Sequence, residues 1–279
     1  MKLYPSVRPY WHVDAKWICG LLFVFCLFVT LLLATAVKLT DENRGPKIAA
    51  LAIGSMFIRD DSLTDIDEMK RTLKKQGGVI RPLPTMPEVT ITKQDLSLSA
   101  TEIKLKVFTP LTTILYNDGI EATAKRFATS PKEEQKFIND ASALRLFTKQ
   151  THNSLNGLLG IFSTLSALLL IGVIYFSARW GRLANFGLQL FIVGVPGSLL
   201  GLLLTNPPKN GDSALGFLPV DIATELGVVI GEVYYWIAIS GLLILLLALI
   251  GRVISFVTKK TTRKPPTTND AKPKTTTTT

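Results

Sequence analysis

The chain has 279 residues, of which 47% are hydrophobic, and its formal net charge is +10. The positive excess lies mainly at the ends of apolar runs and in the C-terminal tail. That distribution is suited to anionic lipid and argues against a nucleic-acid-binding surface, so the composition indicates a membrane protein.

Four apolar runs dominate the sequence, at residues 17–37, 155–178, 183–205 and 233–257. Each is close to or above the roughly 20 residues that a helix needs to cross a bilayer. They predict a membrane all-α fold with four transmembrane helices. The long segment between the first two runs, residues 38–154, has nearly balanced charge, and we expect it to form a mostly α-helical extracytoplasmic domain.

The sign of the charge between the runs predicts the orientation. The leader 1–16, the turn 179–182 and the tail 258–279 are basic, so the positive-inside rule places them and both termini in the cytoplasm. The loop 206–232 is acidic and belongs outside. The residues expected to contact lipid headgroups or to orient the protein are Arg179, Arg182, Arg252, Lys259, Lys260, Arg263 and Lys264. We expect the tail, rich in Lys, Pro and Thr, to be disordered.

Aromatic residues flank two of the runs. Trp11, Trp17, Tyr234, Tyr235 and Trp236 are the predicted membrane-interface anchors. The first run also contains Ala34-Thr35-Ala36, a small-residue pattern typical of a signal-peptidase site. Because the run exceeds the roughly 7 to 15 apolar residues of a signal peptide, we favour its retention as a span over cleavage after Ala36.

Cysteine usage bears on the compartment. Both cysteines of the chain, Cys19 and Cys26, lie in the first apolar run, where we interpret them as small apolar side chains. The segment 38–154 contains neither a cysteine nor an Asn-x-Ser/Thr acceptor. These features favour a bacterial plasma membrane over a eukaryotic cell surface.

The first part of the segment 38–154 contains one short apolar stretch and one amphipathic helix. We expect Ile48–Ile58 to pack on the domain or on the bilayer surface. A helix is predicted from the N-cap Ser62 to Gly77, with acidic residues near its start and basic residues near its end. The alternation Val89–Thr92 then predicts a short edge strand.

Two further helix starts are visible in the same segment. Ser99 and Glu102 form a capping box, and the helix that follows is expected to turn at Gly119. Ser130, Pro131 and Glu133 form a second start signal, after which no breaker occurs before the turn 179–182. We therefore expect one continuous helix from about 131 that contains both a stalk and the second span; it could transmit a movement or serve as a plain stalk.

Small residues mark the expected helix contacts. In the second and third spans these are Gly157, Gly160, Thr164, Gly194, Gly197 and Gly201, and Pro196 is expected to kink the third. The pattern favours packing within the chain and leaves self-association as the alternative.

Acidic residues of the loop 206–232 share one face of a predicted amphipathic helix. Asp221 and Glu225 are one turn apart and could share a divalent cation. We favour a solvated or lysine-paired stripe that also includes Glu232.

Motifs of soluble catalysis are missing from the sequence. The two histidines, His12 and His152, are expected on opposite sides of the bilayer, and no phosphate-binding glycine loop or nucleophile elbow occurs. We therefore expect a non-enzymatic interaction, scaffold or accessory-sensor protein without a metal or cofactor. The expected partners are the lipid bilayer and a membrane or envelope protein, with a homo-oligomer as a further option.

The alternative function is transport. In outline the layout resembles the mechanotransmission class of ABC permeases, which implies a permease-like subunit that works with a separate ATPase. The turn Ser177–Asn185 departs from that pattern because it is too short for a helix that grips an ATPase. An intramembrane enzyme is disfavoured because convergent polar residues are lacking, and a claudin-like barrier because the long segment lacks cysteine.

Overall fold

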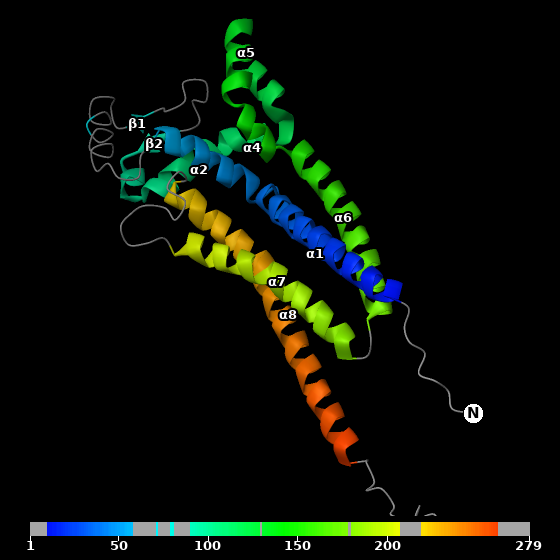
Figure 1. The fold of residues 1–279 in the computed structure, drawn as a ribbon. Coiled ribbons are helices and arrows are strands. Elements are labelled where there is room, and N and C mark those ends of the chain that lie inside the picture. Colours follow the sequence, from blue (N-terminus) through cyan, green and yellow to red (C-terminus); the bar gives the residue numbers. More distant parts are fainter. Residues whose placement is uncertain are drawn as a thin grey trace, which may run out of the picture.

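The computed structural model describes residues 10–57, 71, 79–80, 90–128, 130–177, 180–206 and 219–261. Helices make up nearly all of this part of the chain (Figure 1). The helix predicted to start at Ser62 lies outside the described residues, as do Arg179, Arg263 and Lys264.

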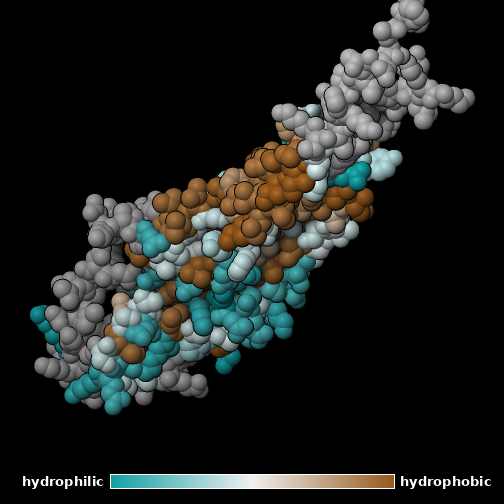
Figure 2. Space-filling view, turned by 90° about the horizontal axis from the view of Figure 1, so that it is seen from below, coloured by the Kyte–Doolittle hydropathy of each residue, from teal (hydrophilic) through white to brown (hydrophobic). Residues whose placement is uncertain are grey.

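Four helices are long and apolar enough to cross a membrane, as predicted. They are α1 (Tyr10–Leu39), α6 (Lys149–Phe176), α7 (Trp180–Thr205) and α8 (Val220–Thr261). Their outward faces carry large apolar side chains such as Ile171 and Leu247, which are 64% and 59% exposed. Figure 2 shows these apolar residues as a broad band along the molecule. Such a surface is suited to lipid and not to water.

The four helices form two pairs, α1 beside α6 and α7 beside α8 (Figure 1). The pairs meet in a shared apolar core whose buried members are Phe23, Leu27, Leu31, Val173, Leu190, Val193 and Tyr234. A polar contact crosses the same boundary, because Nε2 of Gln189 donates to the carbonyl of Gly20 at 3.3 Å. Oε1 of Gln189 is buried and accepts no hydrogen bond from the described residues.

The helix α8 has 42 residues, and it joins two elements that the sequence analysis separated. The amphipathic part of the loop 206–232 and the fourth span are one continuous helix. No proline interrupts residues 220–261, which explains why the helix does not end at the expected membrane boundary. At its C-terminal end, α8 extends beyond α7 (Figure 1).

The residues between α1 and α6, 40–148, are called the interhelix segment below. Its elements are α2 (Gly45–Phe57), β1 (Val79–Ile80), β2 (Ile91–Thr92), the 3-10 helix η1 (Gln94–Ser97), α4 (Ala100–Phe127), α5 (Pro131–Asp140) and the 3-10 helix η2 (Ser142–Phe147). The strands pair antiparallel, with Val79 opposite Thr92. A small core of Ala50, Ile91, Ile103, Val107 and Phe108 joins α2 to α4, so the stretch from Ile48 packs on this segment, one of the two predicted locations.

The capping box that opens α4 is confirmed. The Ser99 side chain accepts from the backbone N–H of Glu102, and the Glu102 carboxylate accepts from the backbone N–H of Ser99 at 2.8 Å. The predicted turn at Gly119 is also confirmed, since Gly119 has φ 83°, a left-handed conformation that glycine adopts without steric cost. The chain then resumes a helix up to Phe127.

The prediction of one continuous helix from about 131 is wrong. Ser130 caps α5 as expected, but α5 ends at Asp140, and η2 and the extended residue Thr148 follow. The Thr148 side chain accepts from the backbone N–H of Thr151 and thereby starts α6 as a separate helix. A threonine hydroxyl that caps a new helix competes with helix continuation, and this explains the break.

Candidate functional site

A buried ion pair joins the interhelix segment to α8. Nζ of Lys104 on α4 lies 3.3 Å from Oδ2 of Asp221 in the first turn of α8. The Lys104 side chain is 0% exposed and the Asp221 side chain is 18% exposed. Oγ1 of Thr101 donates to the other carboxylate oxygen of Asp221 at 2.9 Å. Both oxygens of Asp221 therefore bind α4, and the paired charges offset the cost of burying Lys104.

Three helices converge on Lys104. Its aliphatic stem lies against Gly54 of α2, where a Cβ atom would be 2.7 Å from Cγ of Lys104. Because real Cβ atoms do not approach other carbons that closely, position 54 requires glycine unless the lysine shifts. The same side chain thus contacts α2 with its stem and α8 with its ammonium group.

A second contact binds α8 to the end of α1. Oε1 of Glu232 accepts from Nη2 of Arg44 at 2.9 Å, and Oε2 accepts from Nζ of Lys38 at 3.3 Å. The hydrogen bond to Glu232 raises the pKa of Arg44. These side chains are about one-third to one-half exposed, so the contact is worth less than its charges suggest. It nevertheless connects α8 to both α1 and the start of the interhelix segment.

These contacts account for most of the predicted acidic stripe. Asp221 pairs with Lys104, and Glu232 pairs with Lys38 and Arg44, which fits the lysine-paired form of the favoured interpretation, a solvated or lysine-paired stripe. Glu225 lies between them and is exposed. Among the described residues, no group of three or more His, Cys, Asp or Glu side chains is placed to hold a metal ion.

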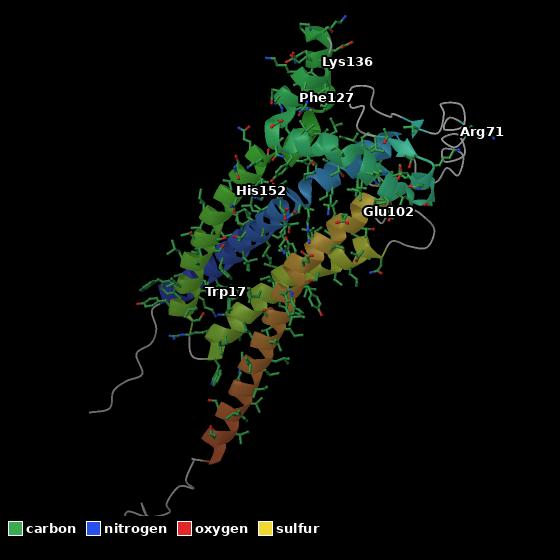
Figure 3. The ribbon with its side chains drawn as sticks, turned by 180° about the vertical axis from the view of Figure 1, so that it is seen from behind. Trp17, Arg71, Glu102, Phe127, Lys136 and His152 are labelled. Atoms are coloured by element: carbon green, nitrogen blue, oxygen red, sulfur yellow. The ribbon has the colours of Figure 1, made fainter. Side chains whose placement is uncertain are left out.

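Two hydrogen bonds join α6 to α1 and to Thr40, the residue that follows α1. Oγ1 of Thr30 lies 3.1 Å from Oγ of Ser166, and Oγ1 of Thr40 lies 3.3 Å from Nδ1 of His152. Figure 3 shows His152 on α6 near the interhelix segment, with Trp17 toward the opposite end of the helices. His152 is therefore a polar side chain that ties the end of α1 to the start of α6.

The glycines of α7 lie against α8. A Cβ atom at Gly194 would be 2.6 Å from the backbone nitrogen of Ala238, and one at Gly201 would be 2.8 Å from the nitrogen of Gly231. A Cβ atom at Gly197 would overlap the Tyr234 ring. The three glycines thus permit close packing within the chain, which was the favoured interpretation. Pro196 lies inside the helix, and the kink predicted there stays a prediction.

The small residues of α6 behave differently. A Cβ atom at Gly157 or Gly160 would have no neighbour within 4 Å. These two glycines and Thr164 line a shallow groove on the outward face of α6. Packing against another helix of the described chain, which was predicted for them, is therefore wrong.

The predicted interface aromatics divide into two sets. Trp11, Trp17, Tyr235 and Trp236 are 57%, 71%, 54% and 67% exposed, and their role as membrane anchors stays a prediction. Tyr234 is 3% exposed and belongs to the shared core, so its assignment as an anchor is wrong. It faces inward because Gly197 leaves room for its ring on α7.

Basic residues also lie at the end of the helices that is far from the interhelix segment. The side chains of two of them, Arg182 and Arg252, are described. Nε of Arg182 donates to the carbonyl of Ser177 at 2.9 Å and so closes the turn between α6 and α7. Arg252 lines a cleft between α7 and α8. Lys259 and Lys260 lie on the last turns of α8, and their side chains are outside the described part.

Sequence reasoning missed Lys104, which is the central residue of the contact with α8. A signal was present, because Lys104 shares one helical face with the buried residues Ile103, Val107 and Phe108. A lysine on an apolar helical face indicates a buried partner of opposite charge. The sequence could not identify that partner as Asp221, which lies 117 residues away.

No protein family, no curated protein and no solved structure matches this chain. The described ion pairs fix the interhelix segment to α8 through Asp221 and Glu232, and Lys38 of α1 pairs with the same Glu232. Function is therefore inferred from this connection.

Proposed function

We propose that this protein is a multi-pass plasma-membrane protein that acts without catalysis, as an interaction, scaffold or accessory-sensor protein. The interhelix segment would be its extracytoplasmic domain. The observation that carries this proposal is the Lys104–Asp221 ion pair, which fixes α4 directly to a membrane-type helix. A partner bound to the interhelix segment would therefore act on α8 through side-chain contacts and not through a loose linker.

The charge distribution supports the orientation. The start of α1, the end of α6, the start of α7 and the end of α8 all lie away from the interhelix segment (Figure 1). Arg182 and Arg252 are at that end, and Lys259 and Lys260 follow on α8. We therefore assign that end to the cytoplasm by the positive-inside rule, and we assign the interhelix segment to the opposite side. The lack of cysteine in residues 38–154 favours a bacterial envelope.

The surface most suited to a partner is formed by α5 and η2. These elements protrude from the rest of the interhelix segment, with Lys136 near their tip (Figure 3). No residue of η2 is buried, and Leu146 is 61% exposed. Polar and charged side chains of α5, including Lys132 and Gln135, are exposed beside it. An exposed leucine surrounded by mixed charges is suited to a protein partner.

The break between α5 and α6 weighs against the transport alternative. A permease-like subunit of the mechanotransmission type would need a tall continuous second helix, and η2 interrupts this one at residues 142–147. The permease-like function is therefore kept as the alternative that the crosslinking experiment below can detect.

The test is crosslinking of the tagged full-length protein in its native membrane, followed by purification in mild detergent and mass spectrometry. A photo-crosslinking residue at Lys136 or Leu146 should capture an envelope or membrane protein, whereas the same group at Thr258 on α8 should not capture it. Recovery of a stoichiometric ATPase through Thr258 would instead establish the permease-like function. Equal capture at all three sites would contradict a specific surface on α5 and η2.

A further inference from the structure

An apolar cleft lies between the beginning of α7 and the last third of α8. It has a volume of about 690 Å³, and its lining includes Trp180, Ala184, Leu245, Ala248, Leu249 and Arg252. We call it the Arg252 cleft. It exists because small side chains, Ala184 and Ala248, face the space between the helices, while α8 extends beyond the beginning of α7 (Figure 1).

A glycine places the tryptophan of this cleft. A Cβ atom at Gly251 would overlap the six-membered ring of Trp180, so this ring lies directly on the α8 backbone. The indole is 43% exposed and forms one wall of the cleft. An indole with an apolar body and one N–H donor is the side chain typical of the level of lipid headgroups.

The charge at the cleft is positive, and no carboxylate among the described residues pairs with it. Arg252 is exposed and forms no ion pair with the described residues. Neither α7 nor residues 233–261 contain a single Asp or Glu, so the neighbouring helices supply no carboxylate. Arg182, at the start of α7, adds a second positive charge at this end.

An apolar cleft between two helices, with a guanidinium at its end that forms no ion pair with the described residues, matches the chemistry of one ligand class. A phospholipid has apolar chains to fill the cleft and a phosphate that a guanidinium binds through two parallel hydrogen bonds. We propose that the Arg252 cleft binds an anionic phospholipid, with one acyl chain between α7 and α8 and the phosphate at Arg252. A zwitterionic choline lipid fits less well because its ammonium group adds a cation beside Arg252 and Arg182. This assignment requires only that the four apolar helices lie in a bilayer, and it is independent of the proposed partner.

A second apolar groove provides an internal contrast. It lies between α1, α7 and α8, has a volume of about 730 Å³, and is lined by residues such as Ala36, Ile192 and Pro196. No charged residue lines it. If apolar shape alone selected lipids, the two spaces would behave alike; if Arg252 selects them, only the Arg252 cleft discriminates between headgroups.

The experiment measures contact between Trp180 and brominated lipids, which quench tryptophan fluorescence. Trp11, Trp17 and Trp236 are replaced by Phe in the full-length chain, so that Trp180 is the one remaining tryptophan and can be excited selectively. The protein is reconstituted into phosphatidylcholine vesicles that contain a minor fraction of dibrominated phosphatidylglycerol or dibrominated phosphatidylcholine. We expect a preference of roughly fivefold for phosphatidylglycerol. This is about the gain in binding that one cation near an anionic headgroup provides.

Matched variants assign the preference to the cleft. Arg252→Ala and Ala184→Leu should each abolish it, the first by removing the charge and the second by filling the space. Arg252→Lys should retain most of it, and Arg145→Ala and Ala36→Leu should leave it unchanged. Equal quenching by the two lipids, or a preference that survives Arg252→Ala, would overturn the proposal.

Three further readouts keep the proposal testable. Soluble glycerol phosphate should not restore quenched fluorescence; if it did, the site would bind a free phosphate and not a lipid. Trp180 fluorescence that changes with the protein-to-lipid ratio even in vesicles without brominated lipid would assign the cleft to a second copy of the chain. That result would contradict the proposal. If Arg252→Ala fails to fold, native mass spectrometry of the unsubstituted protein should retain one phosphatidylglycerol per chain more tightly than phosphatidylcholine, and the opposite order would refute it.

Discussion

Lys104 and Asp221 lie 117 residues apart in the chain, yet their side chains form the ion pair that fastens α4 to the first turn of α8. The lysine is fully buried and the aspartate sits at a helix N-terminus, where its negative charge is favourable. Breaking this pair should loosen both α2 and α4 from α8, because Lys104 belongs to α4 and its stem lies against Gly54 of α2.

Replacement of Asp221 by Asn should destabilise the protein by about 2 to 4 kcal/mol, because it removes the Asp221 charge from the pair with the buried Lys104 ammonium. The value is set somewhat below that of a fully buried pair, since Asp221 is partly exposed. The measurement is thermal unfolding of the purified protein in mild detergent. The double variant Lys104→Met with Asp221→Leu should recover most of the loss, because it removes both charges together.

Lys132→Met serves as the control for that experiment. Lys132 is exposed on α5, away from α8, and its replacement should change stability by no more than about 0.5 kcal/mol. An Asp221→Asn protein as stable as the unsubstituted one would show that the ion pair does not hold α4 to α8.

Replacement of Gly197 and Gly201 by Leu should weaken the contact between α7 and α8. The new side chains would overlap Tyr234 and the backbone at Gly231, and the expected cost is on the order of 1 to 3 kcal/mol. The measurements are thermal unfolding and disulfide crosslinking between cysteines placed on the two helices. The matched control is Gly157→Leu with Gly160→Leu on the open face of α6, which should leave both readouts unchanged in a monomer. Equal losses of stability in the two double variants would contradict the assignment of Gly197 and Gly201 to the contact between α7 and α8.

The stability of the interhelix segment should depend on pH through Asp95. The hydrogen bond from Lys106, followed by that from the backbone N–H of Thr92, lowers the pKa of Asp95. Because the folded value lies below the unfolded one, this stabilisation is complete above the unfolded pKa of about 4 and is lost as the pH falls through the folded pKa.

The variant Asp95→Asn measures that contribution. At neutral pH it should cost about 1 to 3 kcal/mol, since the carboxylate is buried and accepts three hydrogen bonds. The difference from the unsubstituted protein should shrink as thermal unfolding is followed from neutral pH down to about pH 3. Asp118→Asn, at the exposed turn before Gly119, is the control. A difference that stays constant with pH would contradict the assignment.

The proposed orientation predicts which side of the membrane each end of the molecule faces. In a chain with Cys19 and Cys26 replaced by Ala, a cysteine at Lys136 should react with a membrane-impermeant maleimide in intact cells. A cysteine at Thr258 should react only after permeabilisation, because the proposed orientation puts the basic end of α8 in the cytoplasm. The reverse labelling pattern would show that the positive-inside rule fails for this protein.

The sequence by itself determined the elements whose signals are local. Apolar length specified α1, α6, α7 and α8, because about 20 apolar residues in a row suit a bilayer whatever the surroundings. The capping box at Ser99 and the turn at Gly119 were likewise readable, since each depends on residues within one helical turn. The break at Thr148 was not readable. A threonine inside a helix and a threonine that caps a new helix look the same in the sequence.

Tertiary structure alone decided which residues meet. Gly197 faces Tyr234 while Gly157 faces open space, although both glycines carry the same sequence signal for helix packing. Lys104 finds Asp221 only after α4 and α8 are brought together, and this turns an ordinary acidic stripe into an attachment point. Hydropathy and capping are properties of neighbours in the chain, whereas burial and charge pairing depend on neighbours in space, which the packing of the two helix pairs and the interhelix segment selects.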